Sequence, residues 1–300
     1  AYLTEVQKAA KNQCIGKKNW PAIAEINAWM MSAETATFMK WGGLGMVASE
    51  LPESFNATFG KQNHNITIIT PMYIGNTGKK CASFDGKTYF GAEGNSVAVQ
   101  KIITLKVPFI STRKNLTVYN VAVYKSSFNN VDYMFLHNEH FFSINPHRSN
   151  PSAQDGCYVL NEHGINEVER FAFFSKAVYT LLKECAASAK STLPCPNILI
   201  ANDWHSGALA GLCKYGTIME VRDKSMTEEI AARIQDTPII HIAHHLGYQG
   251  WDYPNTAKIL NSLYEHNTQA VFKNAKANKN SNPRTPNTLI VYDCYNQASG

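Results

Sequence analysis

Four short runs of apolar residues constrain the fold of this chain more than any other feature of its sequence. Within each run the apolar residues are largely continuous, which is typical of parallel strands that helices cover on both faces. The runs are Ile26 to Met31, Ile66 to Thr70, Ile198 to Ala201 and Ile239 to Ala243. Helical stretches lie between them, and strands that alternate with helices are joined by right-handed crossovers. The sequence therefore predicts an α/β fold with a Rossmann-like, doubly wound parallel sheet.

The clearest helix is predicted from Glu167 to about Lys183. Apolar side chains recur there at spacings of three and four residues, so they fall on one side of the helix and form a single buried stripe. The stripe consists of Phe171, Phe174, Val178, Leu181 and Leu182.

The segment from about Cys81 to Leu136 has a different pattern. Asp85-Gly86 is a tight-turn signal between two short β-prone segments, and Leu116 to Tyr124 alternates with β-branched and aromatic residues. We interpret residues 81–136 as antiparallel hairpins inserted into the α/β core.

Long loops are predicted in two places. Residues from Asn138 to Gly156 include two prolines and many polar side chains, and residues from Lys273 to Asn287 are rich in Lys, Asn and Pro. The predicted domain spans residues 26–300 and follows an N-terminal extension of residues 1–25.

Composition narrows the classes of partner. The chain has 28 basic and 23 acidic residues in 300, with no long charged run, which argues against a nucleic-acid partner. No run of about 18 apolar residues exists, so we expect no membrane span. Seven scattered cysteines without a C-x-x-C pair are typical of reduced cytosolic thiols, so we predict a cytoplasmic protein without a disulfide framework.

A glycine-rich turn, Lys40-Trp41-Gly42-Gly43-Leu44-Gly45, follows the first predicted strand. Glycines between a strand and a helix let backbone N–H groups approach a phosphate, and the helix N-terminus favours negative charge. Lys40 would add a positive charge. The spacing matches neither the P-loop nor the dinucleotide fingerprint, and a turn without function is the alternative.

Polar side chains follow the third predicted strand as Asn202-Asp203-Trp204-His205. Ligands of open parallel sheets bind beyond the carboxyl ends of the strands, where these side chains could hold the hydroxyls and the apolar face of a sugar. A helix N-cap at Asp203 with a packed Trp204 is the alternative.

A histidine-rich segment, His241 to Gly250, lies at the end of the fourth predicted strand. Imidazoles near Asp203 and His205 could bind zinc or iron, as in a metal hydrolase. Against that reading, we expect His241 to be a hydrogen-bonded core residue and His245 to point opposite to His244.

Together, four segments resemble the catalytic domain of glycogen and starch synthases, glycosyltransferase family five, in order and approximate spacing. The resemblance extends from about Ile26 to Gly250. The segments are the glycine-rich turn at 40–45, Glu169-Arg170-Phe171-Ala172-Phe173-Phe174-Ser175, Asn202-Asp203-Trp204-His205 and His244-His245-Leu246-Gly247-Tyr248-Gln249-Gly250.

The resemblance implies the N-terminal half of a GT-B architecture, in which two Rossmann-like domains face one cleft. Such enzymes transfer glucose from ADP-glucose or UDP-glucose to an α-1,4-glucan with retention at the anomeric carbon, and no metal or other cofactor is implied. The implied catalytic residues are Lys40, Asp203 and His244. The implied donor-binding residues are Lys40, Gly42, Gly43, Leu44 and His244. The implied sugar- and acceptor-binding residues are Asp203, Trp204, His205, Tyr248 and Gln249.

The chain departs from the family pattern at three positions of the implied site. Met46 stands where the family usually carries Asp, Trp41 replaces a small Thr, and His245 stands where Asn is common. The family's second domain, which supplies an Arg, a Lys and a Glu to the donor, is absent from these 300 residues, so we expect no turnover by them alone. A degenerate module that binds a glucan, a nucleotide or another protein is the alternative function.

Overall fold

Five parallel strands form the centre of the molecule, and each of the four predicted runs is one of them. The computed structural model describes residues 25–62, 64–76, 81–111, 116–144, 156–158, 160–187, 193, 195–216, 227–244, 259 and 263. Predictions for residues 1–24 and 273–287 lie outside these ranges. The parallel strands are β1 (Ile26–Met31), β2 (His64–Pro71), β9 (Val131–His137), β11 (Ile198–Asn202) and β12 (Ile239–Ile242).

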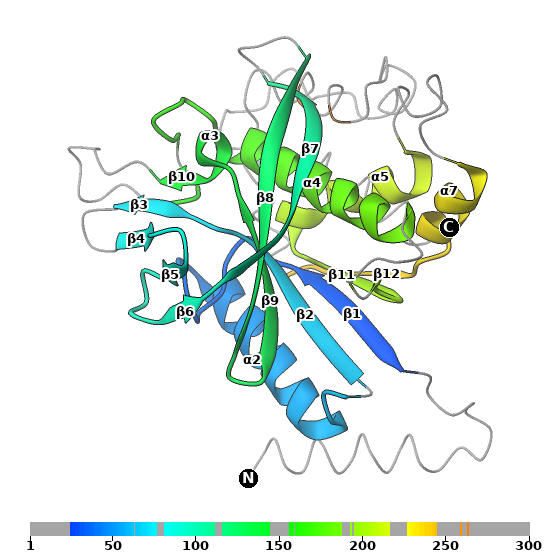
Figure 1. Ribbon diagram of the computed structural model, residues 1–300, viewed down its shortest axis with the longest axis horizontal. Helices are drawn as coiled ribbons and strands as arrows, with labels where there is room; N and C mark the ends of the chain where they lie inside the picture. The colour runs from blue at the N-terminus through cyan, green and yellow to red at the C-terminus, as the bar shows by residue number, and fades with distance from the viewer. Residues whose placement is uncertain are drawn as a thin grey trace.

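The main sheet has seven strands in the order β12-β11-β1-β2-β9-β8-β7 (Figure 1). β8 (Leu116–Phe128) pairs antiparallel with both β9 and β7 (Gln100–Ile110). The predicted antiparallel hairpins are therefore present. The prediction that they are an insertion as far as residue 136 is wrong for β9, which pairs parallel with β2 inside the core.

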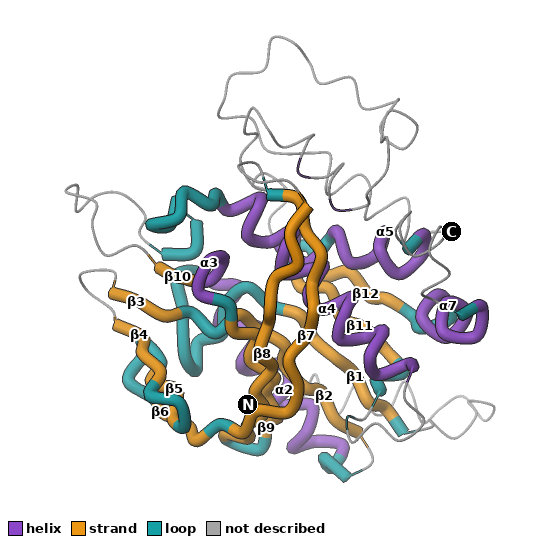
Figure 2. Tube along the Cα trace, turned by 45° about the horizontal axis from the view of Figure 1, so that its top comes forward, coloured by secondary structure: helices purple, strands orange, loops and turns teal. Residues whose placement is uncertain are grey.

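A smaller sheet lies beside the antiparallel end of the main sheet (Figure 2). Its order is β10-β3-β4-β5-β6, and the predicted Asp85-Gly86 turn joins β4 to β5 as an antiparallel pair. Its strands are β3 (Ile74–Asn76), β4 (Cys81–Phe84), β5 (Thr88–Phe90), β6 (Ser96–Ala98) and β10 (Ser143–Ile144). Helix α3 (Glu139–Phe142) and β10 both fall where we predicted an unbroken loop, so that prediction is wrong. Asn138 begins α3 because its side chain accepts a hydrogen bond from the Phe141 amide.

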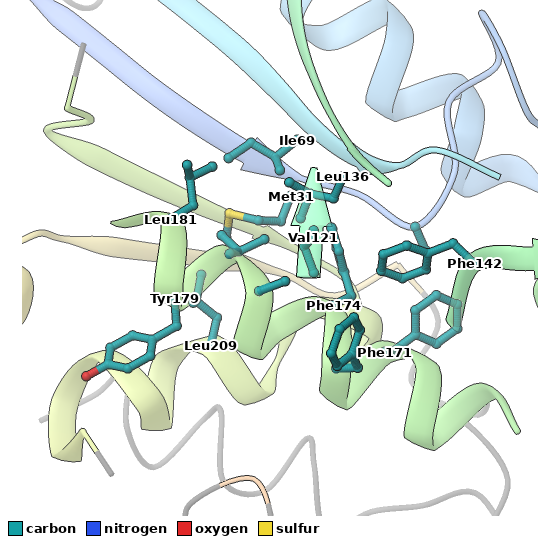
Figure 3. Packing of buried hydrophobic residues seen from close by; sticks show 14 of the residues in the cluster. Met31, Ile69, Val121, Leu136, Phe142, Phe171, Phe174, Tyr179, Leu181 and Leu209 are labelled. Atoms are coloured by element: carbon teal, nitrogen blue, oxygen red, sulfur yellow. The ribbon is translucent and has the colours of Figure 1, made fainter. Parts of the chain in front are cut away.

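Helices cover both faces of the parallel strands. On one face, α2 (Gly43–Phe59) contributes Ala48 to a cluster with Ala28 and Met30 of β1. On the other face, Met31 and other alternate residues of the strands pack against α4 (Glu167–Ala187) and α5 (Ala208–Tyr215) (Figure 3). This two-sided burial explains why the strand sequences are apolar without alternation. A further helix, α7 (Glu228–Gln235), packs beside α4, and none of the described helices is both long and apolar enough to cross a membrane.

Helix α4 is buried on nearly all sides. The five residues of the predicted stripe are buried as expected, and burial extends beyond the stripe to the charged side chains of Glu169, Arg170 and Lys176. Arg170 donates hydrogen bonds to the carbonyls of Phe141 and Cys157. These bonds allow a charged side chain in the interior, where an unpaired charge would be strongly destabilising.

The end of α4 is joined to the segment before β11 by a disulfide between Cys185 and Cys195, whose Cα atoms are 5.6 Å apart. The prediction of reduced thiols throughout is therefore wrong for this pair. The two cysteines are ten positions apart in the sequence, one in α4 and the other just before β11. Three other described cysteines, at positions 81, 157 and 213, are free thiols.

Candidate active site at the carboxyl ends of the strands

The glycine-rich turn holds a buried carboxylate of the chain itself. Glu34 is 1% exposed, and its Oε2 accepts hydrogen bonds from the amides of Trp41 at 2.6 Å and Gly42 at 2.7 Å. The Tyr158 hydroxyl donates to the other carboxylate oxygen. Gly42 is the N-cap of α2, so the carboxylate sits where the helix dipole favours negative charge. The Gly42 amide, which the resemblance assigns to the donor phosphates, donates to Glu34 here.

Lys40 lies at the start of this turn and is partly buried. Its backbone amide donates to Glu93 at 2.9 Å, and its Nζ lies 3.1 Å from the sulfur of Met46 on the first turn of α2. A thioether is a weak acceptor compared with a carboxylate. The contact leaves the positive charge of Lys40 without neutralisation by Met46.

The ring of Trp41 packs among aromatic side chains. It makes edge-to-face contacts with Tyr73 and Tyr158, at centroid distances of 5.3 and 6.3 Å. A Cβ atom at Gly156 would lie 2.0 Å from the Trp41 ring, and Gly156 has a φ of +113°. A glycine at 156 therefore makes room for the Trp41 ring.

Asp203 has the backbone geometry of a strained site residue. Its φ is +62°, which is unusual outside glycine, and its side chain caps the 3-10 helix η1 (Trp204–Ser206) by accepting from the Trp204 amide at 3.0 Å. Its own amide donates to the carbonyl of Ile242 at 2.7 Å, which ties the end of β11 to β12. The helix N-cap alternative is thus present in the structure.

Trp204 and His205 pack into the core. Trp204 is 1% exposed and contacts the Phe171 ring edge-on, so its indole face is covered by protein. His205 is 3% exposed and lies against the rings of Phe171 and Tyr158. Burial, with a smaller contribution from His244, lowers the pKa of His205 to about 3, so its imidazole is neutral at physiological pH.

His244 is exposed at the end of β12 and is tied to the glycine-rich turn by hydrogen bonds. Its Nε2 lies 2.6 Å from Oδ1 of Asn202, and Nδ2 of Asn202 donates to the Ser32 hydroxyl at 3.2 Å. The Ser32 hydroxyl donates to the backbone carbonyl of Glu34 at 2.7 Å. Because β1, β11 and β12 are neighbours, their carboxyl ends bring His244, Asn202 and the turn to one edge of the sheet.

The family model for the starch synthase catalytic domain matches residues 27–282. The chain belongs to this family. Glycogen synthase from Natranaerobius thermophilus is 24% identical over 241 residues, which cover 79% of this chain and 37% of that protein. Glycogen synthase from Finegoldia magna is 29% identical over 177 residues, which cover 58% of this chain and 27% of that protein.

A solved structure is among the similar proteins. The catalytic domain of starch synthase IV from Arabidopsis thaliana, bound to ADP and acarbose, has a TM-score of 0.49 and 18% identity; the match covers 79% of this chain and 37% of that one. Against each of these proteins, this chain spans less than two fifths of the relative's length.

Some residues predicted for the synthase site cannot be placed. Tyr248, Gln249 and His245 lie outside the described residues. Gly43 and Leu44 form the first turn of α2, next to the Glu34 carboxylate. His241 is partly buried in β12, and burial lowers its pKa. Within the described ranges, no group of three or more His, Cys, Asp or Glu side chains has the arrangement of a metal site.

Glu34 and Tyr158 are residues of the site that the sequence analysis missed, and Asn202 was part of a predicted motif without a role of its own. A usable signal existed for one of them, because Glu34 is an isolated carboxylate eight residues before Gly42 in an otherwise uncharged segment. Tyr158 offered none, since 124 residues separate it from its partner Glu34.

A separate cavity of about 820 Å³ opens near the amino ends of β2 and β9. Its floor includes Trp29, Thr67 and Asp132, and Asp132 is paired with Lys61 at 2.6 Å. Parallel strands place this cavity at the opposite end of the sheet from His244. It is therefore not part of the synthase site.

Proposed function

We propose that this chain is the N-terminal, acceptor-side domain of a retaining glucosyltransferase that transfers glucose from ADP-glucose or UDP-glucose to an α-1,4-glucan. Membership of the starch synthase family supports the reaction class. The observation that carries the proposal is the hydrogen-bonded link between His244 and the glycine-rich turn, because it holds the two implied donor-contacting elements at one edge of the sheet.

The chemistry requires stabilisation of two developing charges. Glycosyl transfer passes through an oxocarbenium-like transition state while a nucleoside diphosphate departs. In the proposed mechanism, the Lys40 ammonium and the amides of the first turn of α2 stabilise the departing diphosphate, as preorganised donors do in other transferases. His244 contacts the transferred glucose, and Asp203 lies on the sugar side. No metal is needed for this arrangement.

The proposal includes a second α/β domain that completes the cleft. In the family this domain supplies the Arg and Lys that neutralise the diphosphate and the Glu that holds the donor sugar. We therefore predict that the 300 residues alone do not elongate a maltooligosaccharide, whereas a polypeptide that also carries the second domain does. Glucan elongation by the 300 residues alone would contradict the two-domain requirement.

Donor titration of the two-domain polypeptide by calorimetry tests the assignment of Lys40. A hydrogen bond to a charged group contributes about 1.5–3 kcal/mol, so Lys40→Ala should weaken ADP-glucose or UDP-glucose binding by about 10- to 150-fold. The matched control is Lys87→Ala, an exposed lysine in the turn between β4 and β5, which should bind donor like wild type. Equal donor binding by Lys40→Ala and wild type would exclude a phosphate contact by Lys40.

A degenerate binding module is the second candidate, and one observation favours it. Lys40 faces a thioether at Met46, and the Gly42 amide is occupied by Glu34, so part of the implied phosphate site is altered or filled. Maltooligosaccharide binding without any donor binding by the two-domain polypeptide would establish this candidate. Stoichiometric zinc or iron in elemental analysis would instead contradict the mechanism in which Lys40 and backbone amides stabilise the diphosphate.

A further inference from the structure

A chain of hydrogen bonds at the ends of three strands fixes which atom of Asn202 faces His244. Asn202 is fully buried at the end of β11, between Ser32 after β1 and His244 after β12. An amide side chain has one accepting oxygen and one donating nitrogen, and these are distinguished by their partners rather than by their shape. The partner that decides here is the Ser32 hydroxyl.

The Ser32 hydroxyl has a single proton, and that proton is committed. The carbonyl of Glu34 can only accept, and it lies 2.7 Å from Ser32 Oγ, so the hydroxyl donates to it. The amide of Glu34 also points at Ser32 Oγ, at 3.4 Å, and can only donate. Ser32 Oγ must therefore accept from Asn202, which places the NH₂ group on the Ser32 side and Oδ1 on the His244 side. The flipped amide would leave the Glu34 carbonyl without this donor.

We propose that Asn202 is a positioning residue that holds the ring of His244 with a proton on Nε2. The carbonyl oxygen of Asn202 can only accept, so Nε2 at 2.6 Å must donate to it. In the tautomer with its single proton on Nε2, Nδ1 is the acceptor of the ring. If the proposed function holds, the ligand group that Nδ1 meets is a hydrogen-bond donor, such as a hydroxyl of the transferred hexose, and not an oxygen of the diphosphate.

This inference can be tested on the 300-residue chain without any sugar. Long-range ¹H–¹⁵N spectra of histidine-labelled protein at about pH 8, above the usual imidazole pKa of about 6.5, report which ring nitrogen carries the proton. His244→Gln identifies the signals of His244 by their loss. We expect a protonated Nε2, an unprotonated Nδ1, and a ring proton that exchanges slowly enough with water to be observed.

Variants of Asn202 test whether its side-chain oxygen, rather than burial of the ring, holds the proton on Nε2 of His244. Asn202→Ala removes the acceptor, so the ring proton of His244 should be lost to exchange and its nitrogen shifts should move towards tautomer-averaged values. Asn202→Asp keeps an acceptor of the same shape and should retain the Nε2 proton. Asn120→Ala is the matched control, because Asn120 accepts from Lys106 on the exposed hairpin and should leave the His244 signals unchanged.

A proton on Nδ1 of His244 in the wild-type chain would overturn the inference, as would unchanged ring signals in Asn202→Ala. Asn202 is buried, and if its alanine variant does not fold, the wild-type and Asn202→Asp spectra still decide where the proton is. Failure of the two-domain polypeptide to bind donor would count against the proposed function alone, since the spectra are recorded without donor.

Discussion

Substitution of Glu34 tests how much its buried carboxylate contributes to the stability of the glycine-rich turn. Its carboxylate accepts two backbone hydrogen bonds, at 2.6 and 2.7 Å, and one from the Tyr158 hydroxyl. Glu34→Ala leaves these three donors without their acceptor, and each unsatisfied buried group costs about 1–3 kcal/mol. Trp41 and Gly42 are only partly buried, so water satisfies some of the loss. We expect the free energy of unfolding to fall by about 3–5 kcal/mol.

Glu34→Gln separates the charge from the hydrogen bonds. One amide oxygen can still accept from both backbone N–H groups, while the NH₂ group can donate to the Tyr158 hydroxyl. The free energy of unfolding then falls mainly because a negative charge is lost at the N-terminus of α2, and such a charge contributes about 1–2 kcal/mol at a partly buried site.

Urea denaturation of the 300-residue chain, followed by far-ultraviolet circular dichroism, measures both losses. Glu162→Ala is the matched control, because the Glu162 side chain is 57% exposed and its removal should change stability by less than about 0.5 kcal/mol. The order Glu34→Ala, Glu34→Gln, Glu162→Ala should run from the largest loss to the smallest. A loss below about 1 kcal/mol for Glu34→Ala would refute the view that this carboxylate holds the turn.

Three further predictions concern the surroundings of the site. Gly156→Ala should destabilise the fold through its contact with the Trp41 ring, and Trp41→Ala should remove part of that loss in a double-mutant cycle; strict additivity would contradict the contact. His205 binds a proton when unfolded but not when buried, so stability should be lost as pH falls from about 6.5 towards 3, by up to about 1.4 kcal/mol per pH unit. His205→Gln should flatten that slope in urea titrations at successive pH values, and an unchanged slope would count against the assignment. The Cys185–Cys195 disulfide closes a loop in the unfolded chain and so lowers the entropy of the unfolded state. Its reduction should therefore lower the free energy of unfolding by about 3 kcal/mol, measured with and without dithiothreitol.

The parallel strands were predictable because a strand that is buried on both faces has consecutive apolar residues. In β1, Ala28 and Met30 face α2 while Trp29 and Met31 face the other side, so all four consecutive positions carry buried apolar side chains. β9 carries the same signature from Tyr133 to Leu136, four consecutive buried apolar residues, but the sequence analysis assigned it to the inserted hairpins. It carries Asp132, whose side chain is 34% exposed, and it follows directly from β8 through a hairpin. Its parallel partner is β2, about 65 residues earlier, and local patterns do not identify that partner.

The segments that meet at the candidate site were predictable from their motifs, but the contacts of the individual side chains were not. Lys40, Asp203 and His244 lie in segments with recognisable residue types, and the order of the strands places those segments at one edge. The covering of Trp204 by Phe171 was not predictable, because an indole that stacks on a sugar and one that packs in a core have the same sequence. Cys185 and Cys195 likewise carry no local signal of pairing, since their approach depends on where α4 ends.

Ser32, which belongs to none of the predicted motifs, connects the polar contacts of the site. The Ser32 hydroxyl donates to the Glu34 carbonyl and accepts from Asn202, so it joins the carboxylate that holds the glycine-rich turn to the amide that holds His244. Loss of this hydroxyl frees the amide of Asn202 to rotate and also removes one restraint on Glu34. Both sides of the site should therefore respond to Ser32→Ala, although Ser32 is fully buried and belongs to neither. The single proton of the Ser32 hydroxyl thus determines which group donates and which accepts in the hydrogen bonds from Glu34 through Asn202 to His244.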